Sequence, residues 1–315
     1  MTVIIVSLNL RRLHRYDIII LLKFKRKVTY KHMHTDKLLL VDGSNLLFQM
    51  FFGMPARIVN RNGKAIHGTL GFVGALLKII RITEPTHIAV LFDGEHENER
   101  KVLNADYKAN RTDYSELPEE QCPFTQLADI YAALDYLKIK YAETTVCETD
   151  DWIAGYALTC GKDTQIIISS FDSDYFQLIT ENVSVLRYRG VKTSICTPDY
   201  VFEHFGISPT QYADFKSLVG DTSDNIRGAD KVGPKTSAQL LKRFKTLENI
   251  ISNAEQIESK HIRESITRNA ERLRTNYKLI KLNGDIQLPF ALGALKLKYV
   301  QSTTREVLMG IGLLP

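Results

Sequence analysis

Acidic residues recur in short segments of the chain, and several of them directly follow apolar runs. These residues are Asp42, Asp93, Glu148, Asp150, Asp151, Asp172, Asp174, Asp221 and Asp224. If the fold brings them together, they cannot all remain ionised without cations, because like charges raise one another's pKa. Mg²⁺ and Mn²⁺ are ions that carboxylates hold together with water and phosphate oxygens. The pattern therefore favours a two-ion site of the kind that supports phosphodiester hydrolysis.

The elements that would position these acids alternate between strands and helices. Residues 37–42 and 86–93 are apolar runs that end in Asp, which is typical of buried parallel strands. The sequence also predicts strands over residues 139–141 and 165–170, and helices over residues 72–80, 124–137 and from 148 onward. We therefore expect an α/β fold with a mainly parallel central sheet flanked by helices. Sites in such sheets lie outside the carboxyl ends of the strands, where several of the acids fall.

Each acid taken alone has a simpler interpretation. An Asp after a strand is commonly a turn or N-cap residue. Glu148, Asp150 and Asp151 would complement a helix N-terminus without any metal. We favour the metal site because several separate segments deliver acids to the same predicted edge of the sheet.

The charge is unevenly distributed along the chain. The sequence has 41 Lys and Arg against 36 Asp and Glu, but residues 1–34 hold eight of these bases and only one acid. The remainder is slightly acidic, so the pI of about 8.8 does not by itself indicate a nucleic-acid partner. Residues 1–32 precede Met33 and carry no core-forming pattern, so we expect this extension to be dispensable.

Composition narrows the class of protein further. An apolar fraction of 44% excludes a disordered chain. The apolar runs near the N-terminus are too short to span a bilayer, so we expect no membrane partner. The four cysteines lie far apart with no C-x-x-C pair, which favours a reduced, cytoplasmic compartment over a disulfide framework. We expect a monomer.

The domain organisation changes near residue 199, beyond which helical patterns dominate. We expect a basic extension over residues 1–34, an α/β domain over 35–198, a helical subdomain over 199–290 and a C-terminal segment over 291–315. A Gly- and Asp-rich stretch over 220–234 interrupts the helical part.

A series of motifs resembles those of the bacterial and phage 5′-nucleases, which include the N-terminal domain of DNA polymerase I, stand-alone 5′-3′ exonucleases and flap endonucleases. The motifs are VDGSN (41–45), FDG (92–94), YKANR (107–111), ETDD (148–151), DSD (172–174) and GDTSDN (220–225). The resemblance implies a PIN- or resolvase-like sheet and a helix–hairpin–helix subdomain. It also implies two-metal hydrolysis, with Mg²⁺ or Mn²⁺, of DNA carrying 5′ ends, flaps or nicks. Because little chain remains for a polymerase, we expect a stand-alone enzyme.

The resemblance also assigns roles to individual residues. Asp42, Asp93, Glu148 and Asp150, called here the first acid group, match the first-metal ligands. Asp151, Asp172, Asp174, Asp221 and Asp224, called the second acid group, match the second-metal side or its outer shell. Arg100, Lys108 and Arg111 match the bases at the foot of a helical arch, expected near residues 96–120, and such cations stabilise charge developing on a phosphate. Tyr107 either stacks on a base or sugar or packs within the arch.

Residues 220–241 match the family's helix–hairpin–helix, which holds the duplex. Glycines permit the tight hairpin, and N–H groups at the following helix start face phosphate without reading sequence. The candidate contacts are Tyr107, Gly228, Lys231, Gly233, Lys235 and Thr236. The resemblance implies a K⁺ site at this hairpin, but Lys231 replaces the usual glycine and predicts a less tight turn.

Two other functions remain open at this point. A PIN-type ribonuclease also gathers acids at strand ends, but it lacks the helix–hairpin–helix. A non-catalytic protein that binds DNA structures would not need the complete acidic set. Nucleophilic chemistry at His or Cys has little support, because neither residue type falls inside the motifs.

Overall fold

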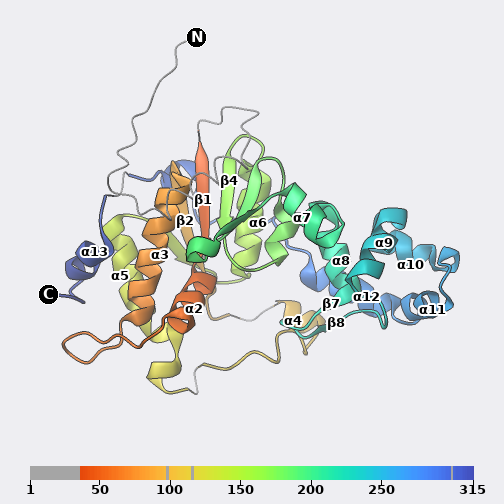
Figure 1. Cartoon of the computed structure of the whole chain (residues 1–315), viewed down its shortest axis with the longest axis horizontal. Coiled ribbons are helices and arrows are strands. Elements are labelled where there is room, and N and C mark those ends of the chain that lie inside the picture. The colour runs from red at the N-terminus through yellow and green to blue at the C-terminus, as the bar shows by residue number, and fades with distance from the viewer. Residues whose placement is uncertain (1–35, 97–98, 115–116, 299–300) are drawn as a thin grey trace, which may run out of the picture.

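The computed structural model describes residues 36–96, 99–114, 117–298 and 301–315 (Figure 1). A six-stranded sheet with strand order β3-β2-β1-β4-β5-β6 forms its centre. The strands are β1 (Lys37–Asp42), β2 (His87–Phe92), β3 (Lys140–Glu143), β4 (Gln165–Ser169), β5 (Val183–Arg187) and β6 (Ser194–Cys196). Neighbouring strands pair in parallel except for β6, which is antiparallel to β5. The predicted α/β fold with a mainly parallel sheet is confirmed. The expected extension over residues 1–34 lies outside the described residues.

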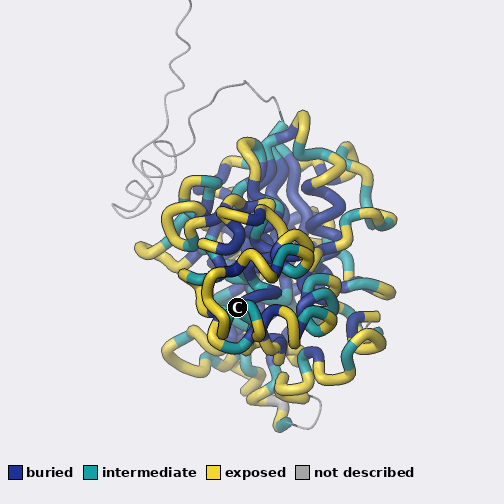
Figure 2. The backbone as a smooth tube through the Cα atoms, turned by 90° about the vertical axis from the view of Figure 1, so that its right-hand side faces the viewer, coloured by how far each residue is buried: buried dark blue, intermediate teal, exposed yellow. Residues whose placement is uncertain are grey.

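The side chains of β1 divide the core into two layers. Leu38 and Leu40 pack on one face of the sheet with α6 (Thr149–Cys160). Leu39 and Val41 pack on the other face with α2 (Gly43–Gly53), α3 (His67–Thr83) and α5 (Leu127–Leu137). Successive strand residues point to opposite faces, and both faces of this sheet are covered, so the strand is apolar throughout. Figure 2 shows the strands as the buried centre of the molecule.

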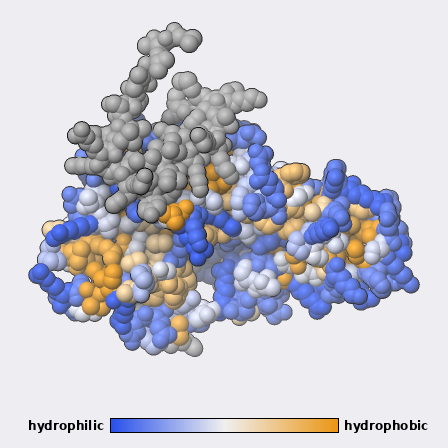
Figure 3. Space-filling model, in the orientation of Figure 1, coloured by the Kyte–Doolittle hydropathy of each residue, from blue (hydrophilic) through white to orange (hydrophobic). Residues whose placement is uncertain are grey.

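The helical subdomain extends to one side of the sheet (Figure 1). Its helices are α7 (Pro198–Phe205), α8 (Tyr212–Val219), α9 (Pro234–Phe244), α10 (Leu247–Ser252), α11 (Lys260–Arg268) and α12 (Ala270–Ile280). A two-stranded hairpin of β7 (Gly220–Asp221) and β8 (Ile226–Arg227) follows α8. Phe215 and Leu241 belong to the same apolar cluster as Leu38, so this subdomain and the sheet share a core. Hydrophilic residues dominate its outer end on the face seen in Figure 3.

The segment expected to form the arch is mostly turns. Within its described part, the α-helical residues are those of α4 (Glu99–Leu103). Figure 1 shows the chain running from the sheet to α4 beside β7 and β8, and then back across to the α5 side. The segment therefore links the sheet edge to the hairpin.

The C-terminal segment belongs to the α/β core. Helix α13 (Thr304–Gly310) packs against α3 and α5, where Val307 is fully buried. Lys296 forms an isolated bridge with His87 at the start of β2. No helix within the described ranges combines the length and apolar character needed to cross a membrane.

Candidate active site

The first acid group lies at the carboxyl edge of the sheet, where the strand order reverses between β1 and β4. Asp42 ends β1, and its Oδ1 accepts a hydrogen bond of 2.9 Å from the Asn45 N–H at the start of α2. Asp93 follows β2, and its Oδ1 accepts from the Thr149 N–H at 2.9 Å. This second bond ties the end of β2 to the start of α6, which carries Glu148 and Asp150.

A buried tyrosine connects two members of this group. The Tyr175 hydroxyl donates a hydrogen bond to Asp150 and lies 3.2 Å from Asp42 Oδ2. Ser170 donates to the same Asp42 oxygen at 2.9 Å. Tyr175 was not among the residues predicted from the sequence. The signal that could have indicated it is its position directly after the DSD motif. Because its ring is fully buried, it holds Asp42 and Asp150 in fixed positions.

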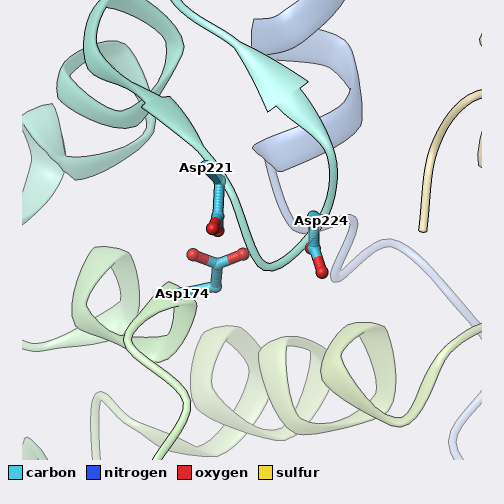
Figure 4. Close-up of side chains that lie close together, drawn as sticks. All are labelled: Asp174, Asp221 and Asp224. Carbon is cyan, nitrogen blue, oxygen red and sulfur yellow. The ribbon is translucent and has the colours of Figure 1, made fainter. Parts of the chain in front are cut away.

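Three members of the second acid group come together around one point. One carboxylate oxygen from each of Asp174, Asp221 and Asp224 lies within 4.8 Å of the others. Figure 4 shows the three side chains, one from the segment after β4 and two from the β7–β8 hairpin. Asp174 begins a short 3₁₀ helix after β4, whereas Asp221 and Asp224 lie in the β7–β8 hairpin. Asp172 orients this helix by accepting a 2.8 Å hydrogen bond from the Asp174 N–H.

The carboxylates of the two acid groups lie close enough to act on one another electrostatically. Burial, followed by the neighbouring Asp93, raises the pKa of Asp42 to about 7. Burial and then Asp172 raise the pKa of Asp174 to about 7, and the same two causes raise the pKa of Asp150. Asp172 thus acts on both groups. A buried set of hard carboxylate oxygens with raised pKa values fits Mg²⁺ or Mn²⁺.

Within the described residues, four basic side chains pair with these carboxylates: Arg100, Lys108, Arg111 and Lys216. Lys108 Nζ lies 2.7 Å from Glu148 Oε1, and Arg111 Nη2 lies 2.8 Å from Asp224 Oδ1. The Lys108 N–H also donates to the Asp224 carbonyl at 3.0 Å, from a left-handed backbone with a φ of 55°. Lys216 contacts Asp174 and Asp221 of the second acid group, and none of the sequence motifs includes it. The YKANR segment is therefore fastened to both acid groups.

Arg100 and Asp151 form a buried ion pair beside Glu148 of the first acid group. The Arg100 guanidinium makes two hydrogen bonds to the Asp151 carboxylate, at 2.7 and 2.9 Å, and one to Glu148 at 2.8 Å. It also donates to the Leu279 carbonyl of α12 at 3.0 Å. Asp151 in addition accepts from the Asn283 N–H at 2.9 Å. This pair therefore joins α4, α6 and the end of α12, and the roles that the resemblance implies for Arg100 and Asp151 stay predictions.

Arg100→Met should lower the free energy of unfolding by about 3–5 kcal/mol, because it leaves buried carboxylates without their partner. The side chains of Arg100 and Asp151 are only 10% and 8% exposed. Urea unfolding followed by fluorescence of Trp152, the single tryptophan, measures this change. Arg243→Met is the matched control, since Arg243 is half-exposed and lies 3.7 Å from the exposed Glu258, and it should cost less than about 1 kcal/mol. Equal losses in the two variants would contradict the assignment.

The side chain of Tyr107 is buried in a small apolar cluster. Its ring is 3% exposed and lies among Ala213, Ile226, Leu279 and Ile280. Its hydroxyl donates to Glu148 at 3.3 Å. Of the two roles left open by the sequence, the structure therefore favours packing within the YKANR segment, because no face of the ring is available to a base.

The hairpin before α9 depends on two glycines that approach each other closely. Gly220 has a φ of 89°, and a Cβ on Gly228 would lie 2.3 Å from the carbonyl carbon of Val219. Gly228 is buried, so its contribution is this close packing. Lys231 adopts the left-handed conformation with a φ of 63°, at a cost of about 1 kcal/mol, so the turn forms despite the lost glycine. Gly233 and Lys235 are exposed and Thr236 is half-buried at the start of α9.

The mainly parallel sheet with carboxylates at the ends of β1, β2 and β4, beside a hairpin between two helices, defines an α/β protein with a helical subdomain. The N-terminal resolvase-like domain of 5′-3′ exonucleases matches residues 37–206, and the C-terminal SAM fold of 5′-3′ exonucleases matches residues 207–303. The chain belongs to the 5′-3′ exonuclease family, which confirms the resemblance drawn from the motifs.

Relatives with this similarity occur both alone and as parts of longer proteins. The 5′-3′ exonuclease of Buchnera aphidicola is 30% identical over 287 residues, which cover 88% of this chain and 97% of that protein. DNA polymerase I of Rhizobium leguminosarum is 36% identical over 274 residues, which cover 84% of this chain. The chain spans only 26% of the length of that polymerase.

Solved structures share the fold. A zinc-bound T5 5′-exonuclease aligns with a TM-score of 0.64 and 22% identity, covering 78% of this chain and 89% of that one. The catalytic core of Rad2 in complex with DNA substrate aligns with a TM-score of 0.54 and 15% identity, covering 88% of this chain and 93% of that one.

Proposed function

We propose that this chain is a divalent-metal-dependent 5′-3′ exonuclease and 5′-flap endonuclease that hydrolyses DNA phosphodiesters. The observation that carries the proposal is the gathering of carboxylates at the carboxyl edge of the sheet, where Tyr175 joins Asp42 to Asp150 and where Asp174, Asp221 and Asp224 converge. The DNA bound by solved relatives, such as the T5 flap endonuclease in a pseudo-enzyme-product complex with DNA and metal ions, supports the choice of substrate.

The acid groups would hold two Mg²⁺ or Mn²⁺ ions. Asp42, Asp93, Glu148 and Asp150 would hold one ion, and Asp172, Asp174, Asp221 and Asp224 would hold the other. Such ions supply activation of the attacking water and neutralisation of charge on the leaving oxygen. Tyr175 would keep Asp42 and Asp150 in position, while the Arg100–Asp151 pair would orient the start of α6.

Lys108 and Arg111 would neutralise the charge that develops on the scissile phosphate. Both bases pair with carboxylates of the acid groups, Glu148 and Asp224. With those acids holding cations, Lys108 and Arg111 would be able to pair with a phosphate at the same place instead. Arg111 is about half-exposed and can present two N–H groups to phosphate oxygens.

The segment before α9 would hold the duplex through backbone N–H groups and bases. Lys231, Gly233 and Lys235 are exposed there, and Pro234 occupies the first turn of α9, where it needs no N–H partner. These contacts would bind phosphate without reading sequence. The K⁺ site implied by the resemblance stays a prediction for this hairpin.

Digestion of end-labelled 5′-flap, nicked and blunt duplexes tests the proposed function. We expect short 5′ products with Mg²⁺ or Mn²⁺ and none with EDTA. A structured RNA of matched length serves as the competing substrate. Preferred cleavage of that RNA would favour a PIN-type ribonuclease, and tight flap binding without cleavage under any metal would favour a non-catalytic DNA-binding protein.

Asp224→Asn should weaken metal binding and leave slow cleavage that increases with Mn²⁺ concentration, because Asp172, Asp174 and Asp221 still define part of the second acid group. A Mn²⁺ titration of the cleavage rate measures this. Asp230→Asn is the matched control, since Asp230 follows the same hairpin and pairs with the exposed Arg227 at 2.7 Å. A flat Mn²⁺ response in the Asp224→Asn variant would count against Asp224 as a ligand.

A further inference from the structure

A lysine lies inside the second acid group. Lys216 Nζ lies 3.2 Å from Asp174 Oδ1 and also contacts Asp221 Oδ2. These are two of the three acids whose oxygens gather around one point (Figure 4). The side chain of Lys216 is only 12% exposed, so the contact is not a surface ion pair.

The fold fixes this lysine at that place. Lys216 belongs to α8, in which Phe215, Ser217 and Leu218 on either side of it are buried. The helix ends at Val219, and the chain turns at Gly220, with a φ of 89°, directly into Asp221. Lys216 and Asp221 are therefore carried by the same helix end. A buried ammonium requires paired acids, and here those acids are candidate metal ligands.

The charges around Lys216 are only partly balanced. Burial opposes the charged form of Lys216, but Asp174 and Asp221 outweigh it and raise the pKa of Lys216. The same contact lowers the pKa of Asp221 against the effect of burial. Arg111 pairs with the third of these acids, Asp224, at 2.8 Å, so three carboxylates face two bases at the place where a divalent ion would bind.

We propose that Lys216 is a built-in cation of the second acid group, which competes with the divalent ion for Asp174 and Asp221 and keeps its affinity low. The inference rests on the proposed function, because it takes the second acid group as a metal site. It adds a residue that sets metal affinity there. A fixed positive charge at this distance opposes a divalent ion, and its removal should strengthen binding.

Binding of Mn²⁺ and Ca²⁺ to the full chain, without DNA, measures the effect. Titration calorimetry, with Mn²⁺ electron paramagnetic resonance beside it, should give a Kd for Lys216→Met that is lower than in the parent by about tenfold or more. Lys216→Arg keeps the charge and should keep the weak affinity. Lys242→Met removes an exposed lysine from α9 and serves as the matched control. Asp174→Asn in the Lys216→Met background should abolish the gain.

Unchanged or weaker binding by Lys216→Met would overturn the proposal, since a lysine that merely holds the acids in place predicts weaker binding. Lys216→Gln guards against misfolding of the Met variant. Its melting temperature should rise more on addition of Ca²⁺ than that of the parent, because tighter binding to the native state stabilises it more. An equal rise would also overturn the proposal. If the unsubstituted protein binds ions but does not cleave DNA, the proposed function is wrong. The Kd values of the unsubstituted protein and the Lys216→Met variant can still be compared in that case.

Discussion

Asp150→Asn should abolish DNA cleavage while leaving flap DNA bound. Asp150 lies at the start of α6, and its carboxylate receives the Tyr175 hydroxyl beside Asp42. The amide removes one charge of the first acid group and replaces an acceptor oxygen with a donor. Loss of a residue that supports a metal ligand typically costs 10–100-fold, so loss of a ligand should cost more than about 10²-fold in the single-turnover rate. Asp93→Asn should behave in the same way.

The protein should remain folded in this variant. Burial and then Asp172 raise the pKa of Asp150, which means that the folded state disfavours its charged form. A neutral amide removes that cost at neutral pH, so Asp150→Asn should be at least as stable as the parent. Gel-shift titration in Ca²⁺ or EDTA at fixed salt should show unchanged or tighter binding, since less negative charge faces the phosphates.

Asp199→Asn is the matched control for Asp150→Asn, because Asp199 is exposed in the first turn of α7. It should cleave at the parental rate. Near-parental cleavage by Asp150→Asn would remove the two-ion mechanism, however closely the motifs match those of the family.

Lys108→Ala should lower the single-turnover cleavage rate by about 10²–10³-fold, with a change in DNA affinity of less than about tenfold. One phosphate contact is a small part of a binding surface, but it acts on the charge that develops in the transition state. Lys108 is held at the site twice, by its side chain at Glu148 and by its N–H at the Asp224 carbonyl. Removing the side chain keeps the second of these links.

Lys101→Ala is the control for Lys108→Ala, since Lys101 is an exposed base of α4 in the same segment. It should leave the cleavage rate unchanged. Single-turnover rates at saturating enzyme, together with gel-shift affinities in Ca²⁺, separate the two effects. If Lys108→Ala cuts at the parental rate while binding collapses, Lys108 serves to dock DNA.

The carboxylates could be placed from the sequence because their positions depend on local patterns. The runs KLLLVD and QIIISS are short and strongly apolar, which is typical of buried strands. In the structure they form β1 and β4, respectively. Parallel strands deliver whatever follows them to one edge of the sheet. The positions of Asp42, Asp172 and Asp174 along the chain, directly after these strands, were therefore enough to predict that they lie at that edge. Strands β5 and β6 were not predicted, because their runs are short and polar residues interrupt them.

The partners of those acids came only from the tertiary structure. Tyr175 reaches Asp42 across 133 positions of the chain, and Arg100 reaches Asp151 across 51. Spacing along the sequence predicts which residues share an element, but it does not predict which side chains from different elements meet. In the sequence, Lys216 is a single base in a mostly apolar helical segment. Its pairing with Asp174 is evident only from the tertiary structure, in which the end of α8 lies beside the segment that follows β4. The sequence alone determined the family and the acids, and packing between distant elements determined which bases neutralise them.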